Sequence, residues 1–469
     1  MRSILIRIFL FSLPVCLILC GCQSHKGDFV PKTEAELAAM EQKNQQAHSA
    51  FLKGDYKTAE KILRQMATER TVSRPLYQLE LLSVLLFDGK HQEAHELMKI
   101  LHTDFETIFD RKSEEKAQSV WHGEINKVYK GDSYERCTFY VLMALSFIEK
   151  GQYEDALRCV KNGLLADADS TAENSVGDYG LLYYLGYFAA SKMKDQQEAA
   201  EYMRGLYKSL VHRDFRVEDQ NGKKKVQHCF EQLSQKDHNV LLVIWAGAPP
   251  TVECLGEYKH IRSVIRGKNP FDFMGISLLT SPVLPIPNNL GDLDFQATTK
   301  GGRLMDNVLA DKAAAKKAME VSKNVFFVLG TGLVIAGART MGTLPVGLSL
   351  LGAGVGCYVV GGTVHIIGSM MNPAADARFW RNIPCQFYIV PLKLPAGKHS
   401  VTVTGYHHFD LAGMSVFEVD VKEGSSVSVH HLPMMTQGQM IWSATAEKLQ
   451  NEIRTALEKA QGNTMAKEL

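Results

Sequence analysis

The sequence predicts an α+β multidomain protein, with an N-terminal α-solenoid followed by a C-terminal β-rich domain that carries a Gly-rich apolar helical hairpin. Three observations support this fold class. A helix–turn–helix signature recurs in the first half of the 469 residues. Short apolar strand patterns, each bounded by turn residues, recur after Asn239. Within that second half, the apolar segment from Val325 to Met371 has only Arg339 and His365 as charged or histidine side chains.

The N-terminus has the pattern of a secretory signal. Two arginines precede a short apolar run, and the sequence Leu19-Cys20-Gly21-Cys22 follows it. The run is too short for a transmembrane helix, and its order of segments is typical of a signal peptide. Its last four residues resemble the bacterial lipobox, which implies lipid attachment at Cys22. Several acyl chains on one residue hold a protein firmly on a membrane. Gln23 after the cysteine implies, by the same resemblance, the outer membrane and its periplasmic side.

The helical half is organised around a repeated Gly-x-x-x-x-Ala turn, in which the third residue is aromatic in two copies. The turn glycines are Gly54, Gly89 and Gly151, the alanines are Ala59, Ala94 and Ala156, and a weaker fourth copy starts at Asp195. A glycine at this place allows a left-handed helix end, and a small alanine allows the two helices to approach closely. The spacing is similar to the middle of the tetratricopeptide repeat, whose period is about 34 residues. Such arrays commonly bind partner proteins on their concave face, and the alternative is a purely structural solenoid.

The C-terminal half predicts a small antiparallel sandwich. The continuous apolar run from Val240 to Trp245 ends at Gly247-Ala248-Pro249-Pro250, as expected of a buried strand that stops at a turn. Further strands are expected at Tyr258–Ile265, Met274–Leu279, Cys385–Val390, His399–Thr404, Ser415–Val421 and Ser425–Val429, with a helix at Ala444–Gln461.

These patterns predict eight consecutive segments. They are a lipoprotein signal peptide (1–21), a lipid-anchored linker (22–32), the helical repeat domain (33–235), the first part of the β-rich domain (236–300), a helix (301–323), the Gly-rich apolar hairpin (324–371), a sandwich-like part (372–440) and a C-terminal helix (441–469).

The apolar hairpin allows three interpretations. Its two helices, Asn324–Ala338 and Leu344–Ser369, could span a membrane, pack inside the C-terminal domain, or insert into one leaflet and self-associate. Basic residues flank the hairpin at both ends, which the lipid anchor would place outside the cytoplasm, whereas the connecting loop has only Arg339. This arrangement opposes spanning and favours burial in protein. The flanking residues are Lys316, Lys317, Lys323, Arg378 and Arg381. Small residues four positions apart offer a surface for oligomer contacts, namely Ser349, Ala353, Cys357 and Gly361.

Four features together resemble an uncharacterised family of bacterial TPR-containing lipoproteins. They are the lipobox cysteine, Tyr129-x-Gly131-x-x-Tyr134-Glu135-Arg136, the strand with its Ala248-Pro249-Pro250 turn, and Asp376-x-Arg378-x-Trp380-x-x-x-Pro384 followed by Leu394-Pro395-Ala396-Gly397-Lys398-His399. Members of that family resemble companions of periplasmic activators of penicillin-binding proteins. The resemblance therefore implies work in envelope or peptidoglycan assembly, and the Gly-rich segment is an addition to the pattern.

Few residues suggest catalysis, so no catalytic residue, cofactor or metal is expected and the protein is expected not to be an enzyme. His91 and His95 have helical metal-ligand spacing, but they coincide with a repeat turn and are expected at the surface. Gly352–Gly356 lacks the ending of a phosphate-binding loop. The formal net charge of +1 and the absence of a basic stripe argue against nucleic acid. Cys137 and Cys159 are the one cysteine pair that could form a disulfide.

One histidine group deserves comparison with metal sites. His407-His408 and His430-His431 end two expected strands, and one residue of each pair, with Asp410, could supply ligands for zinc or copper. Because adjacent strand residues point to opposite faces, at most half of them would converge. Exposed loop histidines are the preferred interpretation.

The sequence therefore predicts a non-enzymatic lipoprotein, tethered through Cys22, whose helical array binds envelope proteins as a scaffold. The alternative is a membrane-embedded component of a transport or secretion complex that uses the apolar hairpin of residues 325–371.

Overall fold

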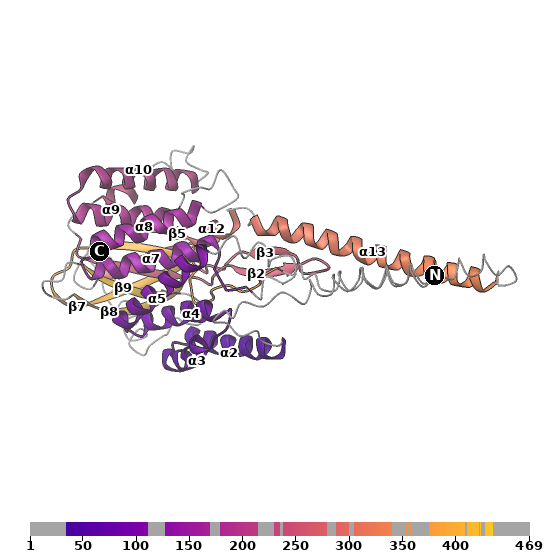
Figure 1. Cartoon of the computed structure of the whole chain (residues 1–469). Coiled ribbons are helices and arrows are strands. Elements are labelled where there is room, and N and C mark those ends of the chain that lie inside the picture. The colour runs from indigo at the N-terminus through magenta and orange to yellow at the C-terminus, as the bar shows by residue number, and fades with distance from the viewer. Residues whose placement is uncertain are drawn as a thin grey trace, which may run out of the picture.

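The computed structural model has an α+β architecture in which helical hairpins cover one face of a β-sheet (Figure 1). It describes residues 34–110, 127–168, 179–213, 229–234, 238–278, 288–299, 304–339, 353, 357, 375–408, 410–421, 423 and 427–434. Cys22, the signal segment and the expected C-terminal helix lie outside these residues.

The helical half consists of consecutive hairpins that stack on one another. Their helices are α2 (Glu34–Leu52), α3 (Tyr56–Thr68), α4 (Arg74–Phe87), α5 (His91–Asp110), α7 (Ser133–Glu149), α8 (Tyr153–Ala168), α9 (Gly180–Lys192) and α10 (Gln196–Arg213). Each of these hairpins packs against the next along the chain, so that apolar side chains are buried both within and between hairpins.

The predicted turn chemistry is confirmed. The three turn glycines have φ between +72° and +76°, and the alanines at 59, 94 and 156 are fully buried. The backbone hydrogen bonds match as well, because the residue after each glycine donates to the carbonyl five positions earlier, as Asp55 does to Ala50. In the fourth turn Lys194 occupies the glycine position with φ of +65°, and Asp195 donates to Ala190 in the same way.

The β half contains two stacked sheets and a separate hairpin. The first sheet has the strand order β5 (Asn288–Asp292), β6 (Gln386–Leu392), β1 (Val240–Ala246) and β9 (Ser428–Met434). The second has the order β4 (Phe273–Leu278), β7 (Gly397–His407) and β8 (Asp410–Val421), and the hairpin joins β2 (Thr251–Leu255) to β3 (Ile261–Ile265). The short helix α12 (Leu293–Thr299) follows β5.

Strand β1 lies between two hydrophobic cores. All seven of its residues are buried, as the continuous apolar run predicted. Leu241, Val243 and Trp245 face the helices, whereas Val240, Leu242 and Ile244 face the second sheet, as the alternation of strand side chains requires. The layers are therefore helices, first sheet and second sheet, with β1 at the centre.

Three details correct the sequence analysis. The sandwich is not wholly antiparallel, because β1 and β9, which are distant in sequence and joined by no hairpin, pair in parallel. The strand expected at Tyr258–Ile265 begins only at Ile261, since Gly256 and Lys259 have positive φ and form a turn. The helix and the first half of the hairpin are one continuous helix, α13 (Leu304–Arg339), which extends away from the rest of the molecule (Figure 1).

Lys194→Gly should stabilise the protein by about 0.5–1 kcal/mol. A left-handed conformation costs a residue with a Cβ about 1–2 kcal/mol, and the extra freedom of glycine in the unfolded chain offsets part of that gain. The free energy of unfolding by urea measures the effect. Gly89→Ala is the matched control. An added Cβ there has no neighbour within 4 Å, so the variant tests only the cost of placing a residue with a Cβ in the left-handed conformation. It should destabilise the protein by about 1 kcal/mol. A destabilising Lys194→Gly would contradict this assignment.

Candidate functional site

The segment before β6 is held against the helices by two buried glutamates. In α4 the Glu80 side chain is fully buried, and its two carboxylate oxygens accept the backbone N–H groups of Arg381 and Asn382 at 2.8 and 2.9 Å. A lone loop has no sheet or helix to satisfy such N–H groups, so this carboxylate takes the place of secondary structure. The C-terminal half is thereby fixed to the second helical hairpin.

Glu135, at the start of α7, binds the backbone of the same segment at Trp380, one residue before Arg381. Its Oε1 accepts the N–H of Trp380 at 2.5 Å and the hydroxyl of Tyr129 at 2.7 Å. Its Oε2 accepts the N–H of Asp132 at 2.6 Å, which completes a capping box at the helix N-terminus. One carboxylate therefore closes a helix end and binds the incoming segment.

Two arginines complete the junction. Arg378 forms two hydrogen bonds to the Asp376 carboxylate, donates to the Ser73 hydroxyl and the Lys127 carbonyl, and lies over the Tyr129 ring. Arg262 of β3 pairs with the buried carboxylate of Asp132 and donates to the backbone of Asp376. Buried charges are thus paired and hydrogen-bonded, as burial requires.

Further polar contacts continue the junction toward the first hairpin. Arg381 forms an ion pair with Glu41 at 2.6 Å, and His48 is 2.7 Å from the Asn382 side chain. We call residues 376–382, with the helix residues that bind them, the inter-half junction. Trp245 adds an apolar contact by packing on Phe87 with ring centroids 4.8 Å apart.

The two junction glutamates have shifted pKa values. Burial raises the pKa of Glu80 to about 7, although the N–H donors of Arg381 and Asn382 lower it in part. Burial also raises the pKa of Glu135 to about 7, with a further contribution from the charge of Asp132. The contacts of these two carboxyls are to backbone N–H groups and, for Glu135, also to the Tyr129 hydroxyl, so both groups fix the 380–382 backbone to the helices.

The inter-half junction unites two motifs that the sequence analysis quoted separately, those starting at Tyr129 and at Asp376. Glu80 was not among the residues expected from the sequence. A single carboxylate within the apolar stretch Leu79–Leu86 did, however, indicate a buried acidic side chain. Arg262 was not expected either, because its strand gives no local indication of a buried ion pair.

Other sequence expectations have mixed outcomes. Cys137 and Cys159 are both buried and do not form the disulfide considered from the sequence, and the Cys137 thiol donates to the Gly163 carbonyl at 3.4 Å. His95 is buried and bonds the Ser146 hydroxyl at 2.9 Å, so it is not at the surface as expected, because its face of α5 packs on α7. His91 instead lies 3.3 Å from Glu149. Of the Gly352–Gly356 run and the small-residue stripe, only residues 353 and 357 are described, and both are helical.

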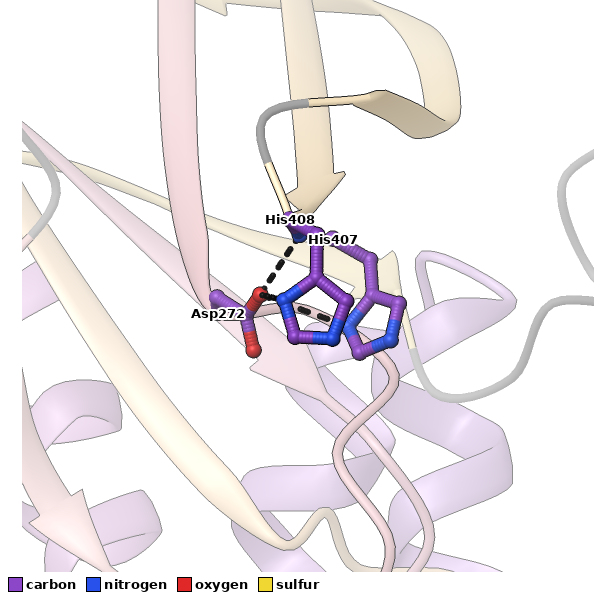
Figure 2. A group of neighbouring side chains, drawn as sticks. All are labelled: Asp272, His407 and His408. Carbon is purple, nitrogen blue, oxygen red and sulfur yellow. Dashed lines mark hydrogen bonds and ion pairs between the residues drawn. The ribbon is translucent and has the colours of Figure 1, made fainter.

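The two histidine pairs are separated, contrary to the arrangement considered from the sequence. His431 lies in the first sheet, where its Nδ1 accepts the Trp245 indole N–H at 3.1 Å and burial lowers its pKa to about 3. His407 and His408 lie at the end of β7 in the second sheet, next to Asp272 (Figure 2). Asp410 is the backbone partner of His407 across the β7–β8 hairpin, and the Asp410 side chain is not among the described ones.

Comparison with known proteins gives no assignment. No protein-family model, no curated protein and no solved structure matches this chain.

The pH dependence of stability should reveal Glu80. Between about pH 4.5 and 7 the folded protein keeps a proton on Glu80 that the unfolded chain has lost, so its contribution to the free energy of unfolding falls as pH rises. The fall should reach about 3 kcal/mol. Urea unfolding of the wild-type protein and Glu80→Gln at several pH values gives two curves whose difference reports the titration of Glu80 together with its coupling to Glu135, whose pKa is also raised. Burial lowers the pKa of His48 and of His95, which contribute the opposite slope to both curves. A constant difference would contradict the prediction.

Proposed function

We propose that the protein is a lipid-anchored lipoprotein of the cell envelope that acts as a protein–protein interaction scaffold. The observation that supports a lipid anchor is the signal-like N-terminal sequence, which ends at Leu19-Cys20-Gly21-Cys22. Acyl chains on Cys22 would tether the molecule to the outer membrane on the periplasmic side. The resemblance to TPR-containing lipoproteins makes envelope or peptidoglycan assembly the process in which it would act.

The stacked helical hairpins support the scaffold role. Helices α4, α7 and α9 pack against strands β9 and β5, and the inter-half junction occupies the same side of the array. The chain's own β half therefore fills much of the side on which repeat arrays commonly hold a peptide. This arrangement favours the opposite side of the array for contacts with other proteins.

Three of the second helices of the hairpins each carry an exposed apolar side chain. These side chains are Ile100 of α5, Leu165 of α8 and Tyr207 of α10, with exposed fractions of 54, 70 and 51%. We propose that an envelope protein binds across these helices.

A triple variant tests the partner surface. Ile100→Asp, Leu165→Asp and Tyr207→Asp together should remove a crosslinked complex that the wild-type chain forms in living cells, because charged groups would have to be buried at the interface. The control replaces Lys99, Arg158 and Arg204, exposed residues of the same helices, with alanine and should keep the complex. Persistence of the same crosslinked protein in the triple variant would reject this surface.

Membrane fractionation with carbonate extraction tests the anchor. Wild-type protein should remain with the membrane, and Cys22→Ala should appear in the soluble periplasmic fraction, since acyl chains supply about 0.8 kcal/mol for each buried CH₂ group. Metabolic labelling with a fatty acid should mark the wild-type protein alone. Membrane retention of an unlabelled Cys22→Ala protein would show that another segment anchors the chain.

Helix α13 favours a second candidate function, a membrane-embedded component of a transport or secretion complex. Among the described residues, one helical stretch, Lys316–Ala336, is long and apolar enough to cross a membrane. No part of its apolar window is buried in the protein, which does not support the interpretation that this segment packs inside the C-terminal domain. Its exposed apolar residues include Val321, Val325, Val328, Leu329 and Ile335.

The middle of α13 contacts the β2–β3 turn through polar side chains. Tyr258 donates its hydroxyl to Glu320 at 2.6 Å, and Lys317 lies 3.5 Å from Glu257. The apolar part lies beyond these contacts and points away from both cores (Figure 1).

Charged substitutions in α13 separate the two candidates. In the Cys22→Ala background, Val328→Asp with Leu329→Asp should release a membrane-retained protein, because each central carboxylate opposes insertion by about 2.5–3.5 kcal/mol. The tethered scaffold predicts instead that Cys22→Ala is already soluble and that the two additional changes leave its distribution unchanged.

A further inference from the structure

Asp272, His407 and His408 gather at the exposed end of the second sheet. Figure 2 shows both imidazole rings on one side of the hairpin, next to the Asp272 carboxylate. One ligand atom from each residue lies within 4.8 Å of the other two. We propose that these three side chains bind a divalent transition-metal ion of the zinc and copper class.

The backbone explains how two adjacent histidines share a side. In a regular strand they would point to opposite faces. His408 instead has φ of +49°, a left-handed conformation that ends β7 at His407. Its backbone N–H donates to Asp272 Oδ2 at 2.7 Å, which holds this conformation in place. The ring centroids of His407 and His408 are consequently only 4.1 Å apart.

Asp272 is positioned just as firmly. Its N–H donates to the Tyr406 carbonyl at 2.8 Å, which continues the β4–β7 ladder by one residue beyond Phe273. The rings of Phe273 and Tyr406 stack with centroids 4.8 Å apart. The three candidate metal ligands therefore lie at the ends of two paired strands, which are a more rigid support than a free loop.

The distances suit a metal ion. Asp272 Oδ2 is 3.3 Å from His407 Nδ1 and 3.6 Å from His408 Nδ1. Tetrahedral zinc with bonds of 2.0–2.2 Å to nitrogen and oxygen places its ligands about 3.3 Å apart, so small side-chain rotations would suffice. Two imidazoles and one carboxylate favour zinc or copper over magnesium or calcium, which prefer oxygen ligands.

Exposure defines the kind of site. The side chains of Asp272, His407 and His408 are 47, 53 and 81% exposed. Three protein ligands leave at least one coordination position open, for water or for a ligand group of another molecule. Ion binding here would also clamp the end of β7 to the start of β4.

Isothermal titration of the untagged full-length chain with Zn²⁺ tests the proposal. We expect one ion per chain and no heat from Mg²⁺. His408→Gly is the most informative variant. It removes one metal ligand, and glycine adopts the left-handed conformation of this position without strain, so the fold should be kept. Asp272→Asn removes the charge but retains an oxygen that can accept the His408 N–H.

Both variants should weaken zinc binding at least about 100-fold, since even residues that only orient metal ligands contribute 10- to 100-fold. The control His430→Ala alters a histidine of the other pair and should bind zinc as the wild-type protein does. Wild-type binding no tighter than that of His408→Gly, or an equal loss in His430→Ala, would overturn the proposal.

Discussion

The burial of Glu80 and Glu135 against the backbone of residues 380–382 is the constraint on which the rest of the structure depends. The side chain of each glutamate is buried, and a buried carboxyl group needs hydrogen-bond partners. The donors come from the segment that leads into β6. Because β6 pairs with β1 along its whole length, these carboxylates connect the helices to the central strand of the molecule.

This connection makes a single unit from two halves of different architecture. Trp245 packs on Phe87 of α4 and on Phe387 of β6, so apolar contacts reinforce the hydrogen bonds. In the proposed tethered scaffold, this connection would hold a partner bound to the second helices of the hairpins at a defined position relative to the β half. Helix α13, in contrast, contacts the β2–β3 turn through Lys317 and Glu320, and its apolar window is not buried in the protein.

The parts of the fold that local chemistry determines could be predicted from the sequence. Left-handed glycines such as Gly151 and the buried run at Val240–Trp245 are signals contained within a few residues. The parallel pairing of β1 with β9 depends on contacts between distant segments, which no local pattern encodes. The place of Asp272 beside His407 has the same origin, and the alternation rule failed for His408 because its backbone leaves the strand. Glu80 lies between these cases, since its apolar neighbours indicated burial but not the identity of the donors.

Hydrogen exchange at the inter-half junction tests the central structural claim most directly. The backbone amides of Trp380, Arg381 and Asn382 lie outside any helix or strand, and a segment without partners would exchange them quickly. If Glu80 and Glu135 bind them as described, they should exchange as slowly as the amides of β1. Fast exchange of these three amides, with α4 and α7 still protected, would contradict the account.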